Sequence, residues 1–344
     1  MFRPDRIIKK SLFINTLPED LLTAEISSER ARRLFSRYVV MVELENHSYC
    51  NRVCWFCPNS HIDRRSTNIL MSDVLFDKVM ADLSSIKYSR DLVWAGYHEP
   101  LAHESIFPRL ARARQTLPAA NLCLISNGDY LNREMVATLE QAGLNFMLSD
   151  LYLPDGREDD EEEQEKALKQ FAKRTGLEPV KKGPRRYDVI GCKFKINMSI
   201  PHFKPESMST RGGSMAIDKT KTYDRRSACF SPVRGFVVNY NGKCMICCQT
   251  RSDVPEHAEA IAGDLNVEGY SLFDCYRDLG PIRRGLLAPG LKTGPCRSCD
   301  VSDDAPDLLA RRPLLARLLK TPGIREKINR AFEPKPKGPA ISVE

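Results

Sequence analysis

Short apolar runs alternate with longer mixed stretches over much of the chain, between about residues 38 and 200. The apolar runs are rich in Val, Ile and Leu and are bounded by polar turns, which is typical of β-strands. Ser72 stands at the N-cap position of one of the longer stretches, which predicts a helix start there. The predicted strands are residues 38–44, 92–95, 122–125, 144–148 and 192–200, and the predicted helices are residues 72–85, 106–116 and 132–142.

Repeated strand–helix units of this length predict an α/β fold with a parallel sheet wrapped by helices. The acidic run at residues 155–165 predicts one more helix start, with its carboxylates near the positive end of the helix dipole. From Cys229 onward, cysteines, glycines and short strands indicate a second unit. The predicted organisation is a lead-in at 1–38, an α/β domain at 39–205, a linker at 206–228, a cysteine-rich domain at 229–305, and a C-terminal helix with a disordered tail at 306–344.

The composition is that of an ordinary globular protein, with 42% hydrophobic and 28% charged residues. No run approaches the roughly 18–20 apolar residues that a membrane span needs, and residues 1–10 lack the apolar core of a signal peptide. We therefore expect a cytoplasmic protein without a membrane partner. The net charge of +7 suits a solvated surface, and no basic stripe interleaved with aromatic residues points to nucleic acid as a partner.

Twelve cysteines are many for a chain of 344 residues. Disulfides are disfavoured in a reducing cytoplasm, where clustered cysteines indicate metal ligands. Cys50, Cys54 and Cys57 follow the first predicted strand on one loop. Three thiolates at this spacing can bind three irons of a 4Fe-4S cubane and leave the fourth iron open. Two of them could instead join another cysteine pair in a tetrahedral zinc site.

The loop resembles the radical S-adenosylmethionine (SAM) superfamily. Residues 50–58 read CNRVCWFCP, which matches the family motif Cys-x3-Cys-x2-Cys with an aromatic residue, Phe56, before the last cysteine. The resemblance covers roughly residues 38–200. It implies a partial (β/α)6 barrel that is open on one side, with a 4Fe-4S cluster on the three cysteines and SAM bound beside Phe56.

Residues 94–101, WAGYHEPL, resemble the Gly-Gly-Glu-like motif of the same family, with His98 in place of the second glycine. The resemblance implies that Gly96 and Glu99 receive the amino group of SAM. A lone glutamate at a strand end would have no such meaning without the cysteine loop upstream.

Residues 125–128, ISNG, resemble the family's Thr-Asn-Gly segment at the end of the next strand. The resemblance implies that Ser126 or Asn127 hydrogen-bonds the ribose or carboxylate of SAM. A turn that uses Asn and Gly for positive φ angles is compatible with the same residues.

A second group of cysteines follows a hairpin signal. Twelve residues separate Cys229 from Gly242, and four separate Gly242 from Cys247. The Asn-Gly pair at 241–242 predicts a tight turn that returns Cys247 to the neighbourhood of Cys229. A close cysteine pair, Cys296 and Cys299, comes later, and a structural zinc ribbon is one possible use of the four thiolates.

This spacing resembles the opening of the SPASM and twitch domains of radical SAM enzymes, and the lack of cysteines after Cys299 favours the shorter twitch form. The resemblance implies an auxiliary 4Fe-4S cluster that moves electrons, because all four irons are bound by the protein. Cys244 or Cys248 could replace Cys247 as the ligand. The implied ligands are Cys229, Cys247, Cys296 and Cys299.

The resemblance implies a radical SAM oxidoreductase that takes a hydrogen atom from a polar small molecule, such as a sugar, aminocyclitol or nucleoside in natural-product biosynthesis. A flavodoxin- or ferredoxin-type partner would supply electrons. The alternatives are an epimerase with a thiol donor (Cys248, then Cys192), a decarboxylase, or a maturase of a ribosomal peptide, although residues 1–38 are too short for a leader-binding domain. Arg211, in a glycine loop, is a candidate clamp for a carboxylate or phosphate, or a plain surface arginine.

Overall fold

The computed structural model describes residues 16–205, 208–215 and 224–301, together with the single residues 321, 323, 324 and 327. Their contacts divide into two compact units. The α/β unit comprises residues 41–208 and 238–242. The cysteine-rich unit comprises the described residues up to 40, residues 209–237 and those from 243 onward. The helix and tail predicted for 306–344 lie outside the described residues, apart from the four single positions.

The strands of the α/β unit lie in the order β1-β2-β3-β4-β7-β6-β5. Neighbours from β1 to β7 are parallel, whereas β6 is antiparallel to both β7 and β5. The predicted α/β class, with a large sheet, is confirmed. The strands are β1 (Met41–Leu44), β2 (Asp91–Trp94), β3 (Asn121–Ser126), β4 (Phe146–Asp150), β5 (Glu178–Gly183), β6 (Arg186–Ile190) and β7 (Lys195–Ser199).

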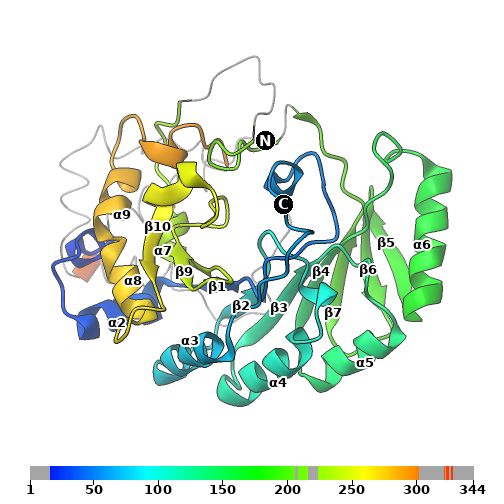
Figure 1. The fold of residues 1–344 in the computed structure, drawn as a ribbon, viewed down its shortest axis with the longest axis horizontal. Helices are drawn as coiled ribbons and strands as arrows, with labels where there is room; N and C mark the ends of the chain where they lie inside the picture. Colours follow the sequence, from blue (N-terminus) through cyan, green and yellow to red (C-terminus); the bar gives the residue numbers. More distant parts are fainter. Residues whose placement is uncertain are drawn as a thin grey trace. The chain divides into compact units, whose positions relative to one another are not determined.

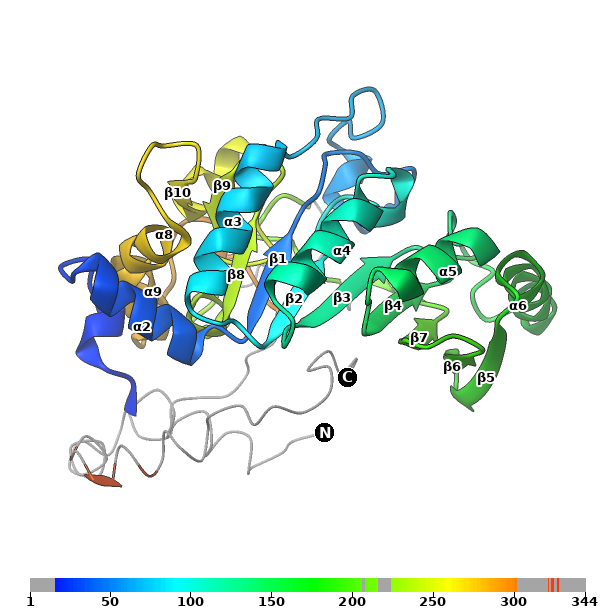
Figure 2. The ribbon, with the colours of Figure 1, turned by 90° about the horizontal axis from the view of Figure 1, so that it is seen from below.

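Four α-helices follow one another along this sheet, as Figures 1 and 2 show. They are α3 (Asp73–Ser85), α4 (Ile106–Thr116), α5 (Arg133–Gln141) and α6 (Glu161–Thr175), with the short helices η2 (Pro58–Ser60) and η3 (Pro100–Ala102) in loops. The side chains of Ser72, Asn132 and Asp160 cap their starts by accepting backbone N–H bonds. No helix within the described residues is long and apolar enough to cross a membrane.

The interior of this unit is built from residues of neighbouring parallel strands. Val93, Ala95, Cys123 and Phe146 are almost completely buried in one cluster. Because β1, β2, β3, β4 and β7 run the same way, their carboxyl ends meet at one edge of the sheet. The loops that carry the first cysteine group, Glu99 and Asn127 leave from this edge.

Two details differ from the sequence-based expectation. The first strand begins at Met41, because the preceding helix α2 continues to Tyr38. The hairpin of β5 and β6 was not predicted. Its residues are mostly exposed or half-buried, and Pro179 and two lysines stand in β5, which is typical of an edge strand that has no continuous apolar pattern.

The cysteine-rich unit consists of short elements. Its strands lie in the order β10-β9-β8. They are β8 (Gly235–Val238, whose last residue counts with the α/β unit), β9 (Lys243–Met245) and β10 (Ile261–Asp264). Its helices are η1 (Glu19–Leu22), α2 (Ser28–Tyr38), α7 (Ser231–Arg234), η5 (Pro255–Ala260), α8 (Leu272–Asp278), α9 (Gly280–Leu287) and η6 (Gly294–Cys296).

Helix α2, from the predicted lead-in, packs into the core of the cysteine-rich unit. Its Phe35 is fully buried, and its ring meets Phe236, Phe273 and Tyr276 edge-on at centroid distances of 5.3–5.4 Å. Edge-to-face aromatic pairs are favourable beyond the area they bury. The N-terminal helix is therefore part of this unit's core.

The Phe35→Ala variant should lower the free energy of unfolding of the cysteine-rich unit by about 3–5 kcal/mol, because it removes the ring at the centre of this cluster. Denaturant unfolding followed by circular dichroism measures the change. Arg33→Ala is the matched control on the same helix, since Arg33 is exposed and, among the described residues, pairs only with Glu29, and it should cost less than about 0.5 kcal/mol. Equal effects of the two substitutions would contradict this packing.

Candidate active site and second cysteine site

The first cysteine loop leaves β1 at the carboxyl edge of the parallel strands. Cys50, Cys54 and Cys57 are half-buried and line one cavity of about 120 Å³. Residues that follow β2, β3 and β4 line the same cavity. The structure thus brings the three cysteines together with Phe56, Gly96, Glu99, Ser126 and Asn127, all named from the sequence, and with Asp150 and Tyr152, which were not.

Burial is the main cause of raised thiol pKa values in this loop. The pKa of Cys50 rises to about 11 and that of Cys54 to about 12, with smaller contributions from the neighbouring Cys57. These thiols carry protons at neutral pH, so a metal that binds them as thiolates must release those protons.

Within the described residues, no three or more His, Cys, Asp or Glu side chains are arranged to hold a single metal ion. In a cubane each thiolate binds a different iron, so its ligands stand farther apart than the donors of a mononuclear zinc site. Three cysteines that line one cavity can serve as the ligands of such a cubane.

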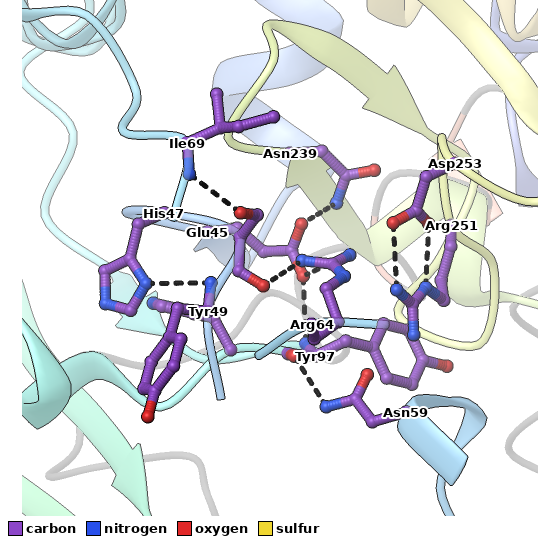
Figure 3. A network of polar contacts seen from close by, with 12 residues as sticks. Glu45, His47, Tyr49, Asn59, Arg64, Ile69, Tyr97, Asn239, Arg251 and Asp253 are labelled. Carbon is purple, nitrogen blue, oxygen red and sulfur yellow. Dashed lines mark hydrogen bonds and ion pairs between the residues drawn. The ribbon is translucent and has the colours of Figure 1, made fainter. Parts of the chain in front are cut away.

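Glu45, just after β1, is buried at 1% exposure and connects three separate segments (Figure 3). Its Oε1 accepts the backbone N–H of Tyr97 at 2.9 Å, and its Oε2 accepts from the Asn239 amide at 2.8 Å. Arg64 Nη2 lies 3.8 Å from Oε1, and the Arg64 side chain is only 3% exposed. This is a buried ion pair.

Arg64 also holds the cysteine loop. Its Nη1 donates to the carbonyl of Ser48 at 2.8 Å, and its own carbonyl accepts the backbone N–H of Cys50 at 3.1 Å. The guanidinium lies over the ring of Tyr240, 5.0 Å from its centroid. One ion pair therefore fixes both the start of the cysteine loop and the segment that leads to Glu99.

The backbone at Gly96 explains why this segment begins with glycine. Gly96 has a φ of +105°, and a Cβ there would stand 2.9 Å from Glu45 Cγ. The His98 side chain, at the position where the family has a second glycine, is 6% exposed. Its Nε2 accepts the backbone N–H of Asn46, and its ring meets His47 edge-on. Burial lowers the pKa of both histidines, so His98 is accommodated as a neutral ring.

The carboxylate of Glu99 is 2% exposed and accepts three hydrogen bonds. Ser126 Oγ donates to Oε1 at 2.7 Å, as does the backbone N–H of Leu101 at 3.0 Å, and the backbone N–H of Asn127 donates to Oε2 at 2.8 Å. Burial nevertheless raises the pKa of Glu99 to about 7. A cationic group beside this carboxylate would favour its charged form.

Asp129 ties the cysteine loop to the end of β3 and was not singled out from the sequence. It accepts from Asn51 Nδ2 at 2.7 Å and from two nitrogens of Arg52 at 2.6 and 2.7 Å. Asn127 in turn donates to Asn51 Oδ1 at 2.8 Å. Ser126 and Asn127 therefore hold Glu99 and the cysteine loop in place, whatever they bind in addition.

Polar and aromatic groups at the ends of β4 and β7 complete this edge. Ser199 Oγ donates to Asp150 at 2.5 Å, and burial raises the pKa of that carboxyl group. Tyr152 stacks on Phe56 at a centroid distance of 5.8 Å. The ring of Phe203 also contacts Phe56, at a centroid distance of 4.0 Å. The sequence signal for these residues was only their place after predicted strands.

The second cysteine group lies in the cysteine-rich unit, where four thiols line one small cavity. They are Cys229, Cys247, Cys296 and Cys299. Burial and the neighbouring thiols raise the pKa of Cys247 and Cys296. Cys244 is completely buried outside this lining and Cys248 is exposed, so of these three neighbours Cys247 is the one that faces the other cysteines.

Three weaker candidates lie apart from these cavities. Arg211 has a φ of +48° and donates to Gln249 Oε1 at 3.1 Å, inside the cysteine-rich unit. Cys192 donates to the carbonyl of Phe194 just before β7, which is the amino-terminal edge of the sheet. Because the site is at the opposite, carboxyl-terminal edge, the structure does not place Cys192 as a hydrogen-atom donor. Cys248 is exposed and accepts from the Gln249 amide.

Comparison with known proteins shows that this chain is similar to one protein family, to one curated protein and to a solved structure. Residues 47–198 match the family described as the Radical SAM superfamily, which confirms the predicted resemblance over that range. A curated protein of Niallia circulans, S-adenosyl-L-methionine-dependent 2-deoxy-scyllo-inosamine dehydrogenase, is 33% identical over 112 residues, which are 33% of this chain and 43% of the relative. The match thus covers less than half of that relative's length.

A crystal structure entitled BtrN in complex with AdoMet and 2-DOIA is similar in fold. Its TM-score is 0.54 at 20% sequence identity, and the match covers 78% of this chain and 97% of that chain.

The Glu45→Gln variant should destabilise the α/β unit by about 3–5 kcal/mol, because it removes the carboxylate that is paired with the buried Arg64 charge. The new amide nitrogen would also face a hydrogen-bond donor on one side, since both Glu45 oxygens accept from N–H groups. Denaturant unfolding of metal-free protein measures the change. Arg112→Gln, which breaks an ion pair between half-exposed side chains, is the control and should cost less than about 1 kcal/mol. If the Glu45→Gln protein were as stable as this control, the ion pair of Glu45 and Arg64 would not stabilise the α/β unit.

Proposed function

Because residues 47–198 match the radical SAM superfamily, we propose that this chain is a radical SAM oxidoreductase that oxidises a polar small molecule of the aminocyclitol type. One observation carries the proposal. Three cysteines of a single loop line one cavity with a buried carboxylate and with the serine and asparagine that hold it. That cavity opens where parallel α/β sheets place their ligands.

In this proposal Cys50, Cys54 and Cys57 would hold three irons of a 4Fe-4S cubane, whose fourth iron would be left for SAM. The α/β unit is then the partial (β/α)6 barrel of the family, with the β5–β6 hairpin at its far edge. When bound, cluster and SAM supply a 5′-deoxyadenosyl radical that takes a hydrogen atom from the substrate. The residues of this chain bind and orient the two reactants and exclude water.

Glu99 is the residue we assign to the SAM ammonium group. Its carboxylate lines the cavity. Burial raises its pKa and so favours the protonated form, whereas a cation bound beside it would favour the charged form. The three protein donors fix its orientation, and because two of them bond to Oε1 and one to Oε2, a lone-pair site is left on Oε2. We assign Ser126 and Asn127 to the SAM ribose or carboxylate in addition to this holding role.

We further propose that Cys229, Cys247, Cys296 and Cys299 hold an auxiliary 4Fe-4S cluster in a twitch-type domain. Four protein ligands leave no iron open, which suits an electron carrier. Oxidation of an alcohol carbon then balances as one hydrogen atom to the radical, one proton to solvent and one electron to this cluster. A flavodoxin- or ferredoxin-type partner would deliver the electron that SAM cleavage consumes.

The substrate class rests on the relative from Niallia circulans, whose name specifies dehydrogenation of 2-deoxy-scyllo-inosamine. Oxidation is favoured over epimerisation because, in the part of the chain that the structure describes, no further cysteine lines the cavity of Cys50, Cys54 and Cys57. An epimerase needs a hydrogen-atom donor there, and Cys192 lies at the other edge of the sheet.

Anaerobically reconstituted protein should contain about eight irons, four for each cubane. The Cys50/Cys54/Cys57→Ala triple variant should keep about half of this iron and lose all SAM cleavage. Iron assays and chromatography of 5′-deoxyadenosine measure the two quantities. Protein purified without oxygen that holds stoichiometric zinc and little iron would overturn the proposal.

Turnover of 2-deoxy-scyllo-inosamine in deuterated water should give one 5′-deoxyadenosine per product and a product oxidised at the attacked carbon. No solvent deuterium should appear at that carbon, because the substrate radical loses a proton and an electron and regains no hydrogen. Mass spectrometry and NMR of the product measure this, with the triple cysteine variant as the inactive control. A product that keeps its C–H bond and carries one solvent deuterium there would identify an epimerase.

A further inference from the structure

Arg225 is a buried arginine next to the second cysteine group. It is 1% exposed, and its guanidinium donates only to carbonyl groups and to one sulfur within the described residues. The carbonyl partners are those of Ser227, Ala228, Cys299 and Val301, at 2.9–3.3 Å. Its Nη1 also lies 3.9 Å from the Sγ of Cys299.

The other fully buried arginines of the same unit have different surroundings. Arg251 forms two bonds to the carboxylate of Asp253, at 2.8 and 2.9 Å (Figure 3). Arg283 stacks on the ring of Tyr276 at 4.1 Å. Arg225 has neither a carboxylate nor an aromatic face among the described residues.

Lys292 is a second buried cation at this site. It is 3% exposed, and its ammonium group donates to the carbonyls of Gly285 and Ala288, with no carboxylate partner in the described ranges. Lys292 and Cys296 line one cavity, and the backbone N–H of Lys292 donates to the carbonyl of Arg225 at 2.9 Å. Burial lowers the pKa of Lys292 and the charge of Arg225 lowers it further, whereas Cys229 and Cys296 raise it. Two like charges are therefore buried near each other and near four cysteines.

A buried charge is costly unless an opposite charge compensates it, and two like charges close together add to that cost. Backbone carbonyls orient the cations but carry no net charge. The cavity that Arg225 and the four cysteines line is the place where the missing negative charge can reside. The pair of cations indicates an anionic occupant.

We propose that Arg225 and Lys292 are the charge-compensating residues of the auxiliary cluster and set its reduction potential high enough for it to accept an electron. This inference rests on the proposed function, which places that cluster on Cys229, Cys247, Cys296 and Cys299. Four thiolates carry more negative charge than the oxidised iron–sulfur core carries positive charge, and reduction adds one more. Nearby buried cations stabilise the reduced form most, and so raise the potential.

The first cysteine site is built differently. Asp129 neutralises its nearby Arg52 with a bidentate ion pair, and Glu99 adds a buried carboxylate. Arg52 and the buried Arg64 near the first site are thus both paired with carboxylates, whereas Arg225 and Lys292 have no such pair within the described residues.

The test uses the full-length Cys50/Cys54/Cys57→Ala variant, in which the auxiliary cluster is the one proposed to remain. Its midpoint potential is measured by redox titration followed by electron paramagnetic resonance. Adding Arg225→Gln should lower the reduced-to-oxidised ratio at a fixed solution potential by about tenfold, a shift of about 59 mV for one electron. Lys292→Met should shift it in the same direction.

Two further variants separate charge from structure. Arg225→Lys keeps the charge but loses most of the carbonyl bonds, and should restore most of the potential. Arg297→Gln is the matched control, because Arg297 lies between two of the ligands in sequence yet is 61% exposed and pairs with Asp224, so solvent screens its charge. This variant should leave the potential unchanged.

The outcomes are distinct for the two proposals. Absence of iron from the triple variant with intact Arg225 and Lys292 would overturn the proposed auxiliary cluster. A loaded cluster whose potential is unchanged by both Arg225→Gln and Lys292→Met would overturn the inference alone. If Arg225→Gln loses its iron, retention by Arg225→Lys supports charge compensation, and loss from both variants overturns it in favour of a purely structural arginine.

Discussion

The buried pair of Glu45 and Arg64 is the interaction on which the active-site edge depends. Glu45 belongs to the end of β1, Arg64 follows the cysteine loop, and the pair reaches the end of β2 through the backbone of Tyr97. Main-chain hydrogen bonds connect the pair to two residues of the candidate site. The N–H of Cys50 donates to the carbonyl of Arg64, and the N–H of Glu99 donates to the carbonyl of Tyr49. Breaking a buried pair costs far more than breaking a surface pair, so this pair holds the two loops firmly in place.

Such rigidity has a chemical use. In the proposed function a cluster and an organic cofactor must meet the substrate at fixed distances, and small errors in position cost much of the rate. Loops are normally the mobile part of an α/β protein. Here the cysteine loop is fixed from two sides, by Arg64 at its start and by Asp129, which binds Asn51 and Arg52 within it. These side-chain contacts therefore hold the positions of the loop residues, although the residues lie outside the sheet.

The elements with strong local signals were predicted from the sequence. The Ser72 cap, the helix at residues 106–116 and the parallel strands before each motif appear where the pattern placed them. Edge strands with mixed polarity, such as β5, carry too little pattern to be recognised. Glu45 and Arg225 look like ordinary surface charges in the sequence, because only the tertiary fold shows that they are buried. Asp129 follows Asn127 so closely that its role could have been suspected.

His98 shows which constraint acts on the segment that resembles the Gly-Gly-Glu-like motif. The glycine-rich form of the segment suggests that small side chains are needed, yet this chain carries an imidazole there. The backbone angle that demands glycine is at Gly96, where Glu45 leaves no room for a Cβ. At His98 the ring turns inward onto His47 and accepts the backbone N–H of Asn46, so the main chain keeps its course. The constraint at this edge is therefore a backbone path fixed by Glu45, and a side chain that leaves that path intact can replace a glycine.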